Sequence, residues 1–240
     1  MRLKPMQKKI KIFIGYDPRE HLAYDVLRHS ILTRSKGEVP VQIIPIELKH
    51  LPMLTRPIEM KEGKMWCPIS KAPMATEFAI SRFCVPFLTK GWALFMDSDM
   101  LVQEDISKLF ELRDDRYAVQ VVKHKQESGA ATKMDGQVQT YYNRKNWSSV
   151  VLWNCDHPAN KKLTIEMVNS LPGRDLHAFS WLKDEEIGEL PSEWNYLVGI
   201  NTGDHTKAKN LHYTLGGPWF PDWKEKQLDN LWIKEKQLMN

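Results

Sequence analysis

The sequence predicts an α/β protein with a mostly parallel central sheet flanked by helices. Strand-length apolar segments alternate with segments of helical periodicity through the first half of the chain, which is typical of this class. The segment 92–96 is continuously apolar, which indicates a strand buried on both faces. Asp97 and Asp99 follow it directly, at the strand end where open α/β sheets bind their ligands.

The composition is that of a globular protein with enough apolar material for a core, since 42% of the 240 residues are hydrophobic and 27% are charged. We expect a single domain that ends in a short amphipathic tail, 221–240. The formal net charge of +4 favours a small anionic ligand and does not indicate nucleic acid as a partner.

The cysteine count and the absence of targeting patterns bear on the compartment. Cys67, Cys84 and Cys155 are odd in number and widely spaced, so we expect no disulfide framework and a reducing environment. The segment 1–11 lacks the apolar core of a signal peptide. No window approaches the roughly 18 apolar residues of a membrane-spanning helix. These features predict a cytoplasmic protein.

The chain opens with a predicted strand at 9–14, a turn at Gly15-Tyr16-Asp17-Pro18 and a helix at 20–33. This order is that of half a mononucleotide-binding unit. It contains no Gly-x-Gly-x-x-Gly and no P-loop lysine, so neither a dinucleotide site nor a P-loop is indicated. Tyr16 and Asp17 fit a surface turn and a nucleotide contact equally well.

The elements that follow are separated by loops, of which the longest are expected to be functional or mobile. A helix at 76–88, expected to end near Pro86, contains Arg82, which is either solvated or directed toward the acidic strand end. The other predicted strands are 41–46, 117–122, 147–154 and a segment from Leu211; the other helices are 105–112, with Asp105 as its N-cap, and 160–171; the loops are 49–71, 129–139 and 190–196.

Two features of the sequence have more than one interpretation. An isolated Asp97-Ser98-Asp99 fits a solvated acidic turn, but two carboxylates beside a sheet crevice also suit Mg²⁺ or Mn²⁺ and a phosphorylated substrate. The tail carries Trp223 and Trp232 among lysines. It is predicted either to pack on the domain as an amphipathic helix or to make a peripheral contact with an anionic membrane surface.

Taken in order, several segments resemble the glycogenin-like retaining glycosyltransferases, glycosyltransferase family 8 and its relatives, which have the GT-A fold. The match extends over most of the chain. It comprises the Phe13–Asp17 opening, the helix with Arg82, the strand before Asp97 and Asp99, Asp105-Ile106, Leu109, Leu190-Pro191, Trp194-Asn195 and the segment from His212 to Trp219.

The resemblance implies a nucleotide-sugar site built around a divalent cation. Asp97, Asp99 and His212 would bind Mn²⁺ (or Mg²⁺), although His212 taken alone fits a structural histidine as well. The donor site would also include Gly15, Tyr16, Asp17, Arg82, Ser98, Gly216 and Gly217. The nucleotide-binding half would then be 1–122 and the acceptor and sugar side 123–220.

The sequence departs from the family pattern at three places. Gly217 stands where the family has the lysine of His-x-x-Gly-x-x-Lys-Pro-Trp, so Lys207, Lys209 or backbone N–H groups would have to neutralise the diphosphate. The strand entrance at 147–150 lacks the family's Asn and Gly. The family's Asp-Gln-Asp is reduced to Asp175-Leu176-His177. Asp175 is the candidate catalytic carboxylate, with a helix N-cap as the alternative.

The resemblance implies transfer of a sugar, with retention, from a nucleotide-diphosphate donor such as a UDP-sugar to the hydroxyl of a saccharide, lipid-linked or protein acceptor. One alternative is a phosphohydrolase of the haloacid-dehalogenase type, although Met100 follows the second Asp where Thr or Val is usual. The other is a non-catalytic nucleotide-sugar-binding protein, which the missing lysine suggests. The sequence does not determine the sugar, the acceptor or the oligomeric state.

Overall fold

The computed structural model describes residues 9–124, 144 and 146–239, so the loop predicted at 129–139 lies outside the described residues. A six-stranded sheet with the strand order β10-β8-β9-β6-β1-β2 occupies the centre of the molecule. Its strands are β1 (Ile10–Gly15), β2 (Val41–Ile46), β6 (Trp92–Met96), β8 (Val119–Val121), β9 (Val150–Asn154) and β10 (Ile187–Glu189).

The pairing in this sheet confirms the predicted class. β1 runs parallel to both β2 and β6, and β8 runs parallel to β10. β9 is antiparallel to its neighbours β6 and β8. Ile14 of β1 is paired with Met96 of β6, so the turns that follow these two strands emerge at the same edge of the sheet. The protein is therefore α/β, with a largely parallel central sheet.

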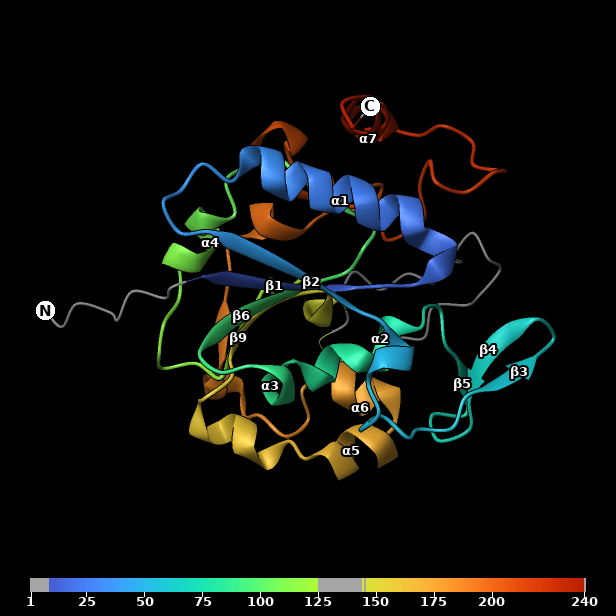
Figure 1. Ribbon diagram of the computed structural model, residues 1–240, viewed down its shortest axis with the longest axis vertical. Helices are drawn as coiled ribbons and strands as arrows, with labels where there is room; N and C mark the ends of the chain where they lie inside the picture. Colours follow the sequence, from blue (N-terminus) through green and yellow to red (C-terminus); the bar gives the residue numbers. More distant parts are fainter. Residues whose placement is uncertain (1–8, 125–143, 145, 240) are drawn as a thin grey trace, which may run out of the picture.

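Helices cover both faces of the sheet (Figure 1). On one face, α1 (His21–Arg34) packs Leu27 and Ile31 with Ile12 and Ile14 of β1. Phe13 points to the opposite face, as the two-residue period of a strand requires, and belongs to the second core cluster with Phe83 and Phe95. The helices on that second face are α2 (Phe78–Ser81), α3 (Val85–Leu88), α5 (Ile165–Ser170) and α6 (Gly173–His177).

A second sheet begins immediately after Asp99, where the chain leaves the central sheet. It has the order β11-β12-β7 and comprises β7 (Met100–Val102), β11 (Tyr196–Leu197) and β12 (Asn210–His212). β12 is antiparallel to β7, which brings a late segment of the chain beside the acidic turn. The short helix α4 (Ser107–Glu111) follows β7.

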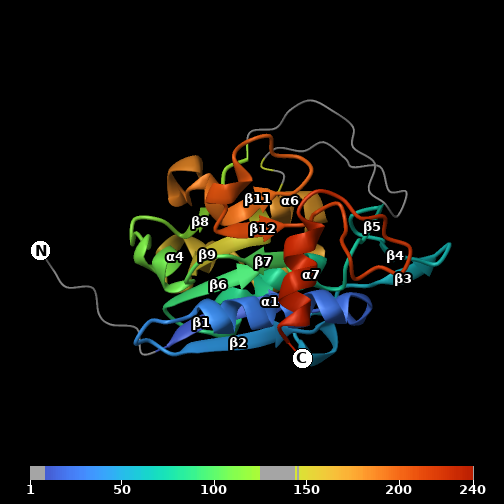
Figure 2. The ribbon, with the colours of Figure 1, turned by 90° about the horizontal axis from the view of Figure 1, so that it is seen from above.

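A third sheet lies within the region predicted as a loop at 49–71. Its strands β3 (Glu59–Lys61), β4 (Lys64–Cys67) and β5 (Ala72–Pro73) are antiparallel and extend away from the body of the molecule (Figure 2). Near its base the buried Arg56 guanidinium donates to the carbonyls of Val168, at 3.1 Å, and Leu171, at 2.6 Å. These bonds tie the hairpin to the end of α5.

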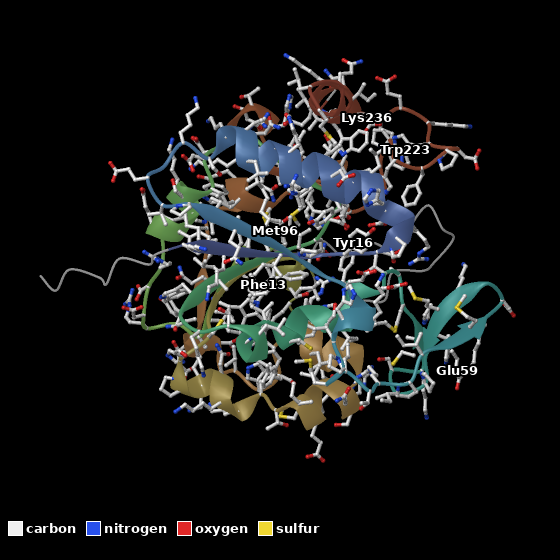
Figure 3. All side chains as sticks on the ribbon, in the orientation of Figure 1. Phe13, Tyr16, Glu59, Met96, Trp223 and Lys236 are labelled. Atoms are coloured by element: carbon white, nitrogen blue, oxygen red, sulfur yellow. The ribbon has the colours of Figure 1, made fainter. Side chains whose placement is uncertain are left out.

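The C-terminal helix α7 (Asp229–Gln237) packs on the body, as one of the two interpretations of the tail predicted. Trp232 is buried with Val26 of α1 and Leu101 of β7. Glu235 lies 2.7 Å from His29 Nδ1 and accepts two hydrogen bonds from the Arg34 guanidinium, at 3.0 and 2.7 Å. Lys236 lies on the periphery (Figure 3). Within the described ranges, no helix is both long and apolar enough to span a bilayer.

Several predicted elements are shorter than the patterns indicated. The segment 76–88 forms α2, a 3₁₀ turn and α3 rather than one helix. Pro86 lies in the first turn of α3, where its missing N–H costs no helical hydrogen bond, so it does not end the helix. Ile106, not Asp105, is the N-cap of α4. Residues 147–149, predicted as the start of a strand, form a 3₁₀ turn. The predicted helix 160–171 is divided into the end of a 3₁₀ helix, Pro158–Lys162, and the shorter α5.

Candidate functional site

The candidate site is built at the corner where the chain passes from the central sheet to the second sheet. Asp97 and Asp99 flank this corner between β6 and β7. The Asp97 N–H donates to the Ser149 carbonyl at 3.0 Å, and the Asp99 carbonyl accepts from the Tyr213 N–H at 2.8 Å. The backbone on either side is therefore fixed by both sheets, and the two carboxylates project from a rigid turn.

His212 reaches this corner because β12 pairs with β7, with His212 opposite Met100. The side chain is only 3% exposed. Its Nε2 lies 3.2 Å from Asp99 Oδ1, and its Nδ1 lies 2.9 Å from Asn195 Oδ1. Because an amide oxygen can only accept, Nδ1 carries a hydrogen, which leaves Nε2 as the ring nitrogen that is able to bind a cation beside Asp99.

Arg82 projects toward the acidic strand end, which confirms one of its two predicted positions. The side chain is buried beneath the corner. Its Nη1 lies 2.8 Å from Asp97 Oδ1 and donates to the Ser148 carbonyl at 2.9 Å. Its guanidinium also lies over the Phe95 ring, 5.0 Å from the centroid. A buried cation of this kind balances one of the two aspartate charges.

Asp97, Asp99 and His212 fit a divalent cation. One ligand atom from each of the three lies within 4.8 Å of the other two. Two carboxylates and one imidazole are a mixed oxygen and nitrogen donor set, which Mn²⁺ accepts readily and Mg²⁺ accepts less well. The hydrogen bond from His212 Nδ1 to Asn195 is the outer contact that ligating histidines usually make.

Two adjoining cavities open at this corner. The larger, about 480 Å³, is lined by polar groups that include Arg82, Asp97, Ser148, His177 and His212; we call it the polar cavity. The smaller, about 360 Å³, lies between Arg19 and Glu20 on one side and Trp219, Phe220 and Trp223 on the other; we call it the aromatic cavity. Both are lined by Ala75, Thr76, Asp99 and Thr214, so Asp99 stands at their common boundary.

Not every residue predicted for the donor site lines these cavities. Gly15 packs its Cα against the Phe78 ring, where an added Cβ would lie 2.4 Å from ring atoms. The Tyr16 hydroxyl lies 3.1 Å from His21 Nδ1. Asp17 is 1% exposed and caps the 3₁₀ turn at Pro18–Glu20. Among the described residues that line either cavity, none of these three occurs.

The Asp17 carboxylate is already occupied by hydrogen bonds. Its Oδ1 accepts from the Arg19 backbone N–H at 2.9 Å, and its Oδ2 accepts from Arg19 Nη2 at 2.6 Å and from the Glu77 N–H at 3.0 Å. Burial alone would raise the pKa of Asp17, but the bonds from Arg19 and Glu77 outweigh it and hold that pKa below its ordinary value. Asp17 thus fixes Arg19 at the rim of the aromatic cavity.

Ser98, Gly216 and Gly217 lie close to the corner but have different surroundings. The Ser98 hydroxyl is buried and donates to Glu20 Oε2 at 3.2 Å. Gly216 lines the aromatic cavity and has a φ of 102°, a left-handed backbone conformation that favours glycine. A Cβ added to Gly217 would lie 2.1 Å from the Trp219 ring.

Asp175 is not the N-cap of its helix. Pro172 occupies that position, and Asp175 lies within α6 with Oδ1 3.5 Å from Arg174 Nε. The Asp175 side chain is absent from the described lining of both cavities. The same is true of Lys207 and Lys209, whose Nζ atoms lie 3.9 Å from Asp204 Oδ2 and 3.1 Å from Glu193 Oε1.

Several residues at the site were missed by the sequence reasoning. Burial and the nearby charges of Asp99 and Asp17 raise the pKa of Glu20 to about 8. Asn195 orients His212, and Arg19 supplies a cation to the aromatic cavity. His177 lies 2.7 Å from the Ser148 hydroxyl. Only Arg19 had a local signal, because Asp17-Pro18 is a typical start of a helical turn and its cap returns to the backbone two residues on.

The comparison with solved structures identifies the fold. WbbM, a bifunctional glycosyltransferase, superposes with a TM-score of 0.62 at 15% identity over 98% of this chain and 50% of its own. The Q189E active-site mutant of LgtC has a TM-score of 0.62 at 13% identity over 95% and 96% of the two chains. GlyE of Streptococcus pneumoniae has a TM-score of 0.58 at 17% identity over 96% and 60%. This chain thus spans only about half of WbbM and three fifths of GlyE.

The fold and the corner site place the protein in the class of GT-A glycosyltransferase folds. No protein-family model matches the chain. The chain is 47% identical to Protein CDI of Arabidopsis thaliana over 98% of its own length and 88% of that relative. It belongs to the family of Protein CDI.

Proposed function

We propose that this protein is a metal-dependent glycosyltransferase that moves a sugar from a nucleotide-diphosphate donor to an acceptor hydroxyl. The observation that carries the proposal is the Asp97, Asp99 and His212 cluster, which lies at the carboxyl end of β6 and at the boundary of two cavities. The GT-A fold supports it, because the solved structures of similar fold are glycosyltransferases, and one of them is the galactosyltransferase LgtC in complex with donor and acceptor sugar analogs.

The aromatic cavity is assigned to the nucleoside and the polar cavity to the sugar and the acceptor. Trp219, Phe220 and Trp223 line the aromatic cavity, and aromatic rings of this kind can stack on a base. Hydroxyl, imidazole and guanidinium groups in the polar cavity suit the hydroxyl groups of a sugar. A donor that occupies both cavities places its diphosphate at their boundary, beside Asp99.

The residues at this boundary have separate parts in the reaction. Asp97, Asp99 and His212 would hold the divalent cation, which supplies positive charge to the departing diphosphate when it is bound. Arg82 balances the charge of Asp97. Arg19 is held by Asp17 and by the Ala75 carbonyl. It brings a second guanidinium to the aromatic cavity and would take the part of the lysine that the family-8 pattern has at the position of Gly217.

The finer assignments follow from the resemblance to glycosyltransferase family 8. They are a UDP-linked donor, Mn²⁺ as the metal and retention at the anomeric carbon. We assign no catalytic carboxylate, since Asp175 lies outside the described cavity lining. A haloacid-dehalogenase-type phosphohydrolase is not favoured by the fold. A non-catalytic nucleotide-sugar-binding protein would share this site and is distinguished by turnover.

The test combines binding and turnover in matched variants. Thermal unfolding of the wild type is measured with a panel of nucleoside diphosphates and nucleotide sugars, with and without Mn²⁺, because ligands of the folded state raise Tm. The stereochemistry of any product is then read by NMR. Asp99→Asn should abolish the Mn²⁺-dependent shift and lower turnover by at least about a hundredfold. Asp184→Asn is the control, since that side chain is 86% exposed.

Three outcomes decide the proposal. A Mn²⁺-dependent shift with a nucleotide sugar, followed by transfer or donor hydrolysis, supports it. Tight binding without any turnover in the wild type would make the protein a nucleotide-sugar-binding protein instead. The absence of any nucleotide-dependent shift in the wild type contradicts both.

A further inference from the structure

Ser148 and His177 form a hydrogen-bonded pair in the wall of the polar cavity. Their Oγ and Nδ1 atoms lie 2.7 Å apart, and both residues line the cavity. Ser148 belongs to the 3₁₀ turn before β9, and His177 is the last residue of α6. The Phe83 ring meets the imidazole edge-on, with 5.3 Å between the centroids. Two separate elements and a core aromatic ring therefore fix the orientation of the imidazole.

The pair is connected to the acidic corner through the backbone of Ser148. The Ser148 carbonyl accepts a hydrogen bond from Arg82 Nη1 at 2.9 Å, and the same nitrogen lies 2.8 Å from Asp97 Oδ1. Ser148 thus holds the Arg82 guanidinium through its carbonyl and the His177 imidazole through its hydroxyl. Any group bound between His177 and Asp97 would meet side chains whose relative positions are set by a single residue.

The neighbouring serine, Ser149, also lines this cavity and bonds to protein atoms. The Ser149 hydroxyl donates to the Asn146 carbonyl at 2.9 Å and accepts from Asn195 Nδ2 at 2.9 Å. Asn195 is in turn bonded to His212. The half-buried His177 ring borders the cavity instead of lying within the core. A hydroxyl and an imidazole side by side offer both a donor and an acceptor, which is what a sugar hydroxyl requires.

We propose that Ser148 and His177 position the transferred glycosyl group by hydrogen bonding its hydroxyl groups over Asp97 and Asp99. The assignment rests on the proposed glycosyltransferase function. Ser148 and His177 are positioning and specificity residues in this assignment. They take no part in breaking the bond between the sugar and the diphosphate. They contribute to recognition of the sugar and not of the nucleoside diphosphate, because the aromatic cavity is lined by neither of them among its described residues.

The experiment compares UDP with a panel of UDP-hexoses, each with Mn²⁺, by calorimetry on the full chain. The variants are Ser148→Ala, His177→Phe, which keeps a ring against Phe83, and His177→Gln, whose amide replaces a ring nitrogen. His50→Phe is the matched control, because His50 is exposed and lines neither the polar nor the aromatic cavity. Transfer or donor hydrolysis is followed as kcat and KM in the same preparations.

We expect Ser148→Ala and His177→Phe to bind UDP within about twofold of the wild type. Their affinity or kcat for the preferred UDP-hexose should fall about tenfold, the effect of one lost hydrogen bond of about 1.4 kcal/mol. His177→Gln should recover part of this loss. A folding defect would weaken UDP and UDP-hexose alike, so the ratio of the two affinities isolates the recognition of the sugar.

The inference is overturned if His177→Phe retains the wild-type ratio of UDP-hexose to UDP affinity together with wild-type kcat. It is also overturned if the variants lose UDP binding to the same degree as UDP-hexose binding, since the pair would then act only on the fold. If the wild type binds neither UDP nor any UDP-hexose, the proposed function fails first and this inference fails with it. The UDP measurement on the wild type separates the two cases.

Discussion

Asn195 Oδ1 lies 2.9 Å from His212 Nδ1 and thereby determines which nitrogen of that histidine faces the two aspartates. Asn195 is itself held by its Nδ2, which donates to the Ser149 hydroxyl at 2.9 Å. Both residues are buried, so neither bond competes with bulk water. The amide fixes the tautomer and the ring orientation before any ligand arrives, and the site does not have to reorganise to bind a cation.

Replacement of Asn195 should therefore weaken metal binding without removing a ligand. We expect Asn195→Ala to lower the affinity for Mn²⁺ by about 10- to 100-fold, the usual effect of losing an outer-shell partner. Calorimetric titration with MnCl₂ measures it. Asn169→Ala is the control, because Asn169 makes comparable hydrogen bonds to the backbone of Thr55 and Met53 and is in neither described cavity lining. An unchanged affinity in Asn195→Ala would contradict the assignment of His212 as a ligand.

The ion pair between Arg82 and Asp97 should contribute more to the free energy of unfolding than an exposed pair does, because it is buried. Arg82→Met leaves Asp97 without its 2.8 Å partner and the Ser148 carbonyl without its donor. We expect the free energy of unfolding in metal-free buffer to fall by about 3 kcal/mol, as when one partner of a buried pair is removed. Urea unfolding measures the change.

Arg116→Met is the matched control for this prediction. Arg116 Nη2 lies 2.6 Å from Asp114 Oδ2, a shorter distance, but the Arg116 side chain is 76% exposed. Its loss should leave the free energy of unfolding nearly unchanged, because water screens exposed pairs. Equal losses in the two variants would show that burial of the Arg82 pair does not matter.

The turn at Gly216 should tolerate no side chain. Alanine there would adopt a left-handed φ of 102° and place its Cβ 2.9 Å from the Trp223 ring. We expect Gly216→Ala to lower the free energy of unfolding by about 1–3 kcal/mol and to weaken UDP binding, because the ring must move in the aromatic cavity. Gly203→Ala is the control, since its Cβ would meet nothing within 4 Å. Equal Tm values for the two variants would contradict this prediction.

The contact of Glu235 with α1 should make the attachment of α7 depend on pH. Burial alone would raise the pKa of Glu235, but hydrogen bonds from Arg34 and His29 outweigh it and hold the pKa below its ordinary value of 4.5. A lowered folded-state pKa adds stability that is complete above the unfolded value and is lost as the pH falls through the folded value.

Glu235→Gln should therefore be less stable than the wild type by about 2 kcal/mol at pH 7, and the difference should shrink as the pH falls below about 4.5. Urea unfolding at pH 7, 5 and 4 measures it. Glu185→Gln is the control, since that carboxylate is 73% exposed. A difference that stays constant across this range would show that the charge of Glu235 is not what holds the helix.

The parts of the fold that produce long hydrophobic patterns in the sequence could be predicted. The strands β1, β2 and β6 are long enough to show their burial in the sequence, and the position of Asp97 and Asp99 follows from the end of β6. The place of His212 beside Asp99 followed from the ordered family resemblance. It could not be derived from local pattern, because β7 and β12 have three residues each, too few for a period to appear.

The remainder of the site depends on contacts between residues that are far apart in the sequence. Asn195 and Ser149 acquire their roles from the packing of the two sheets, which no local signal specifies. The resemblance implies a donor contact for Asp17, but it does not reveal that the Asp17 carboxylate is a buried cap that holds Arg19. The hairpin β3 to β5 was missed because its strands are short and its exposed residues do not alternate.

The corner between the two sheets brings together segments that are far apart in the sequence. Asp97 and Asp99 lie near the middle of the chain and His212 near its end, so a cation held by all three would act as a removable cross-link that closes this loop. Closing so long a loop in the unfolded chain costs conformational entropy, so the unfolded chain does not bring the three ligands together. The cation would therefore bind, and stabilise, only the folded state. Addition of a chelator would loosen the docking of the second sheet on the first, and hydrogen exchange in β7 and β12 would report it.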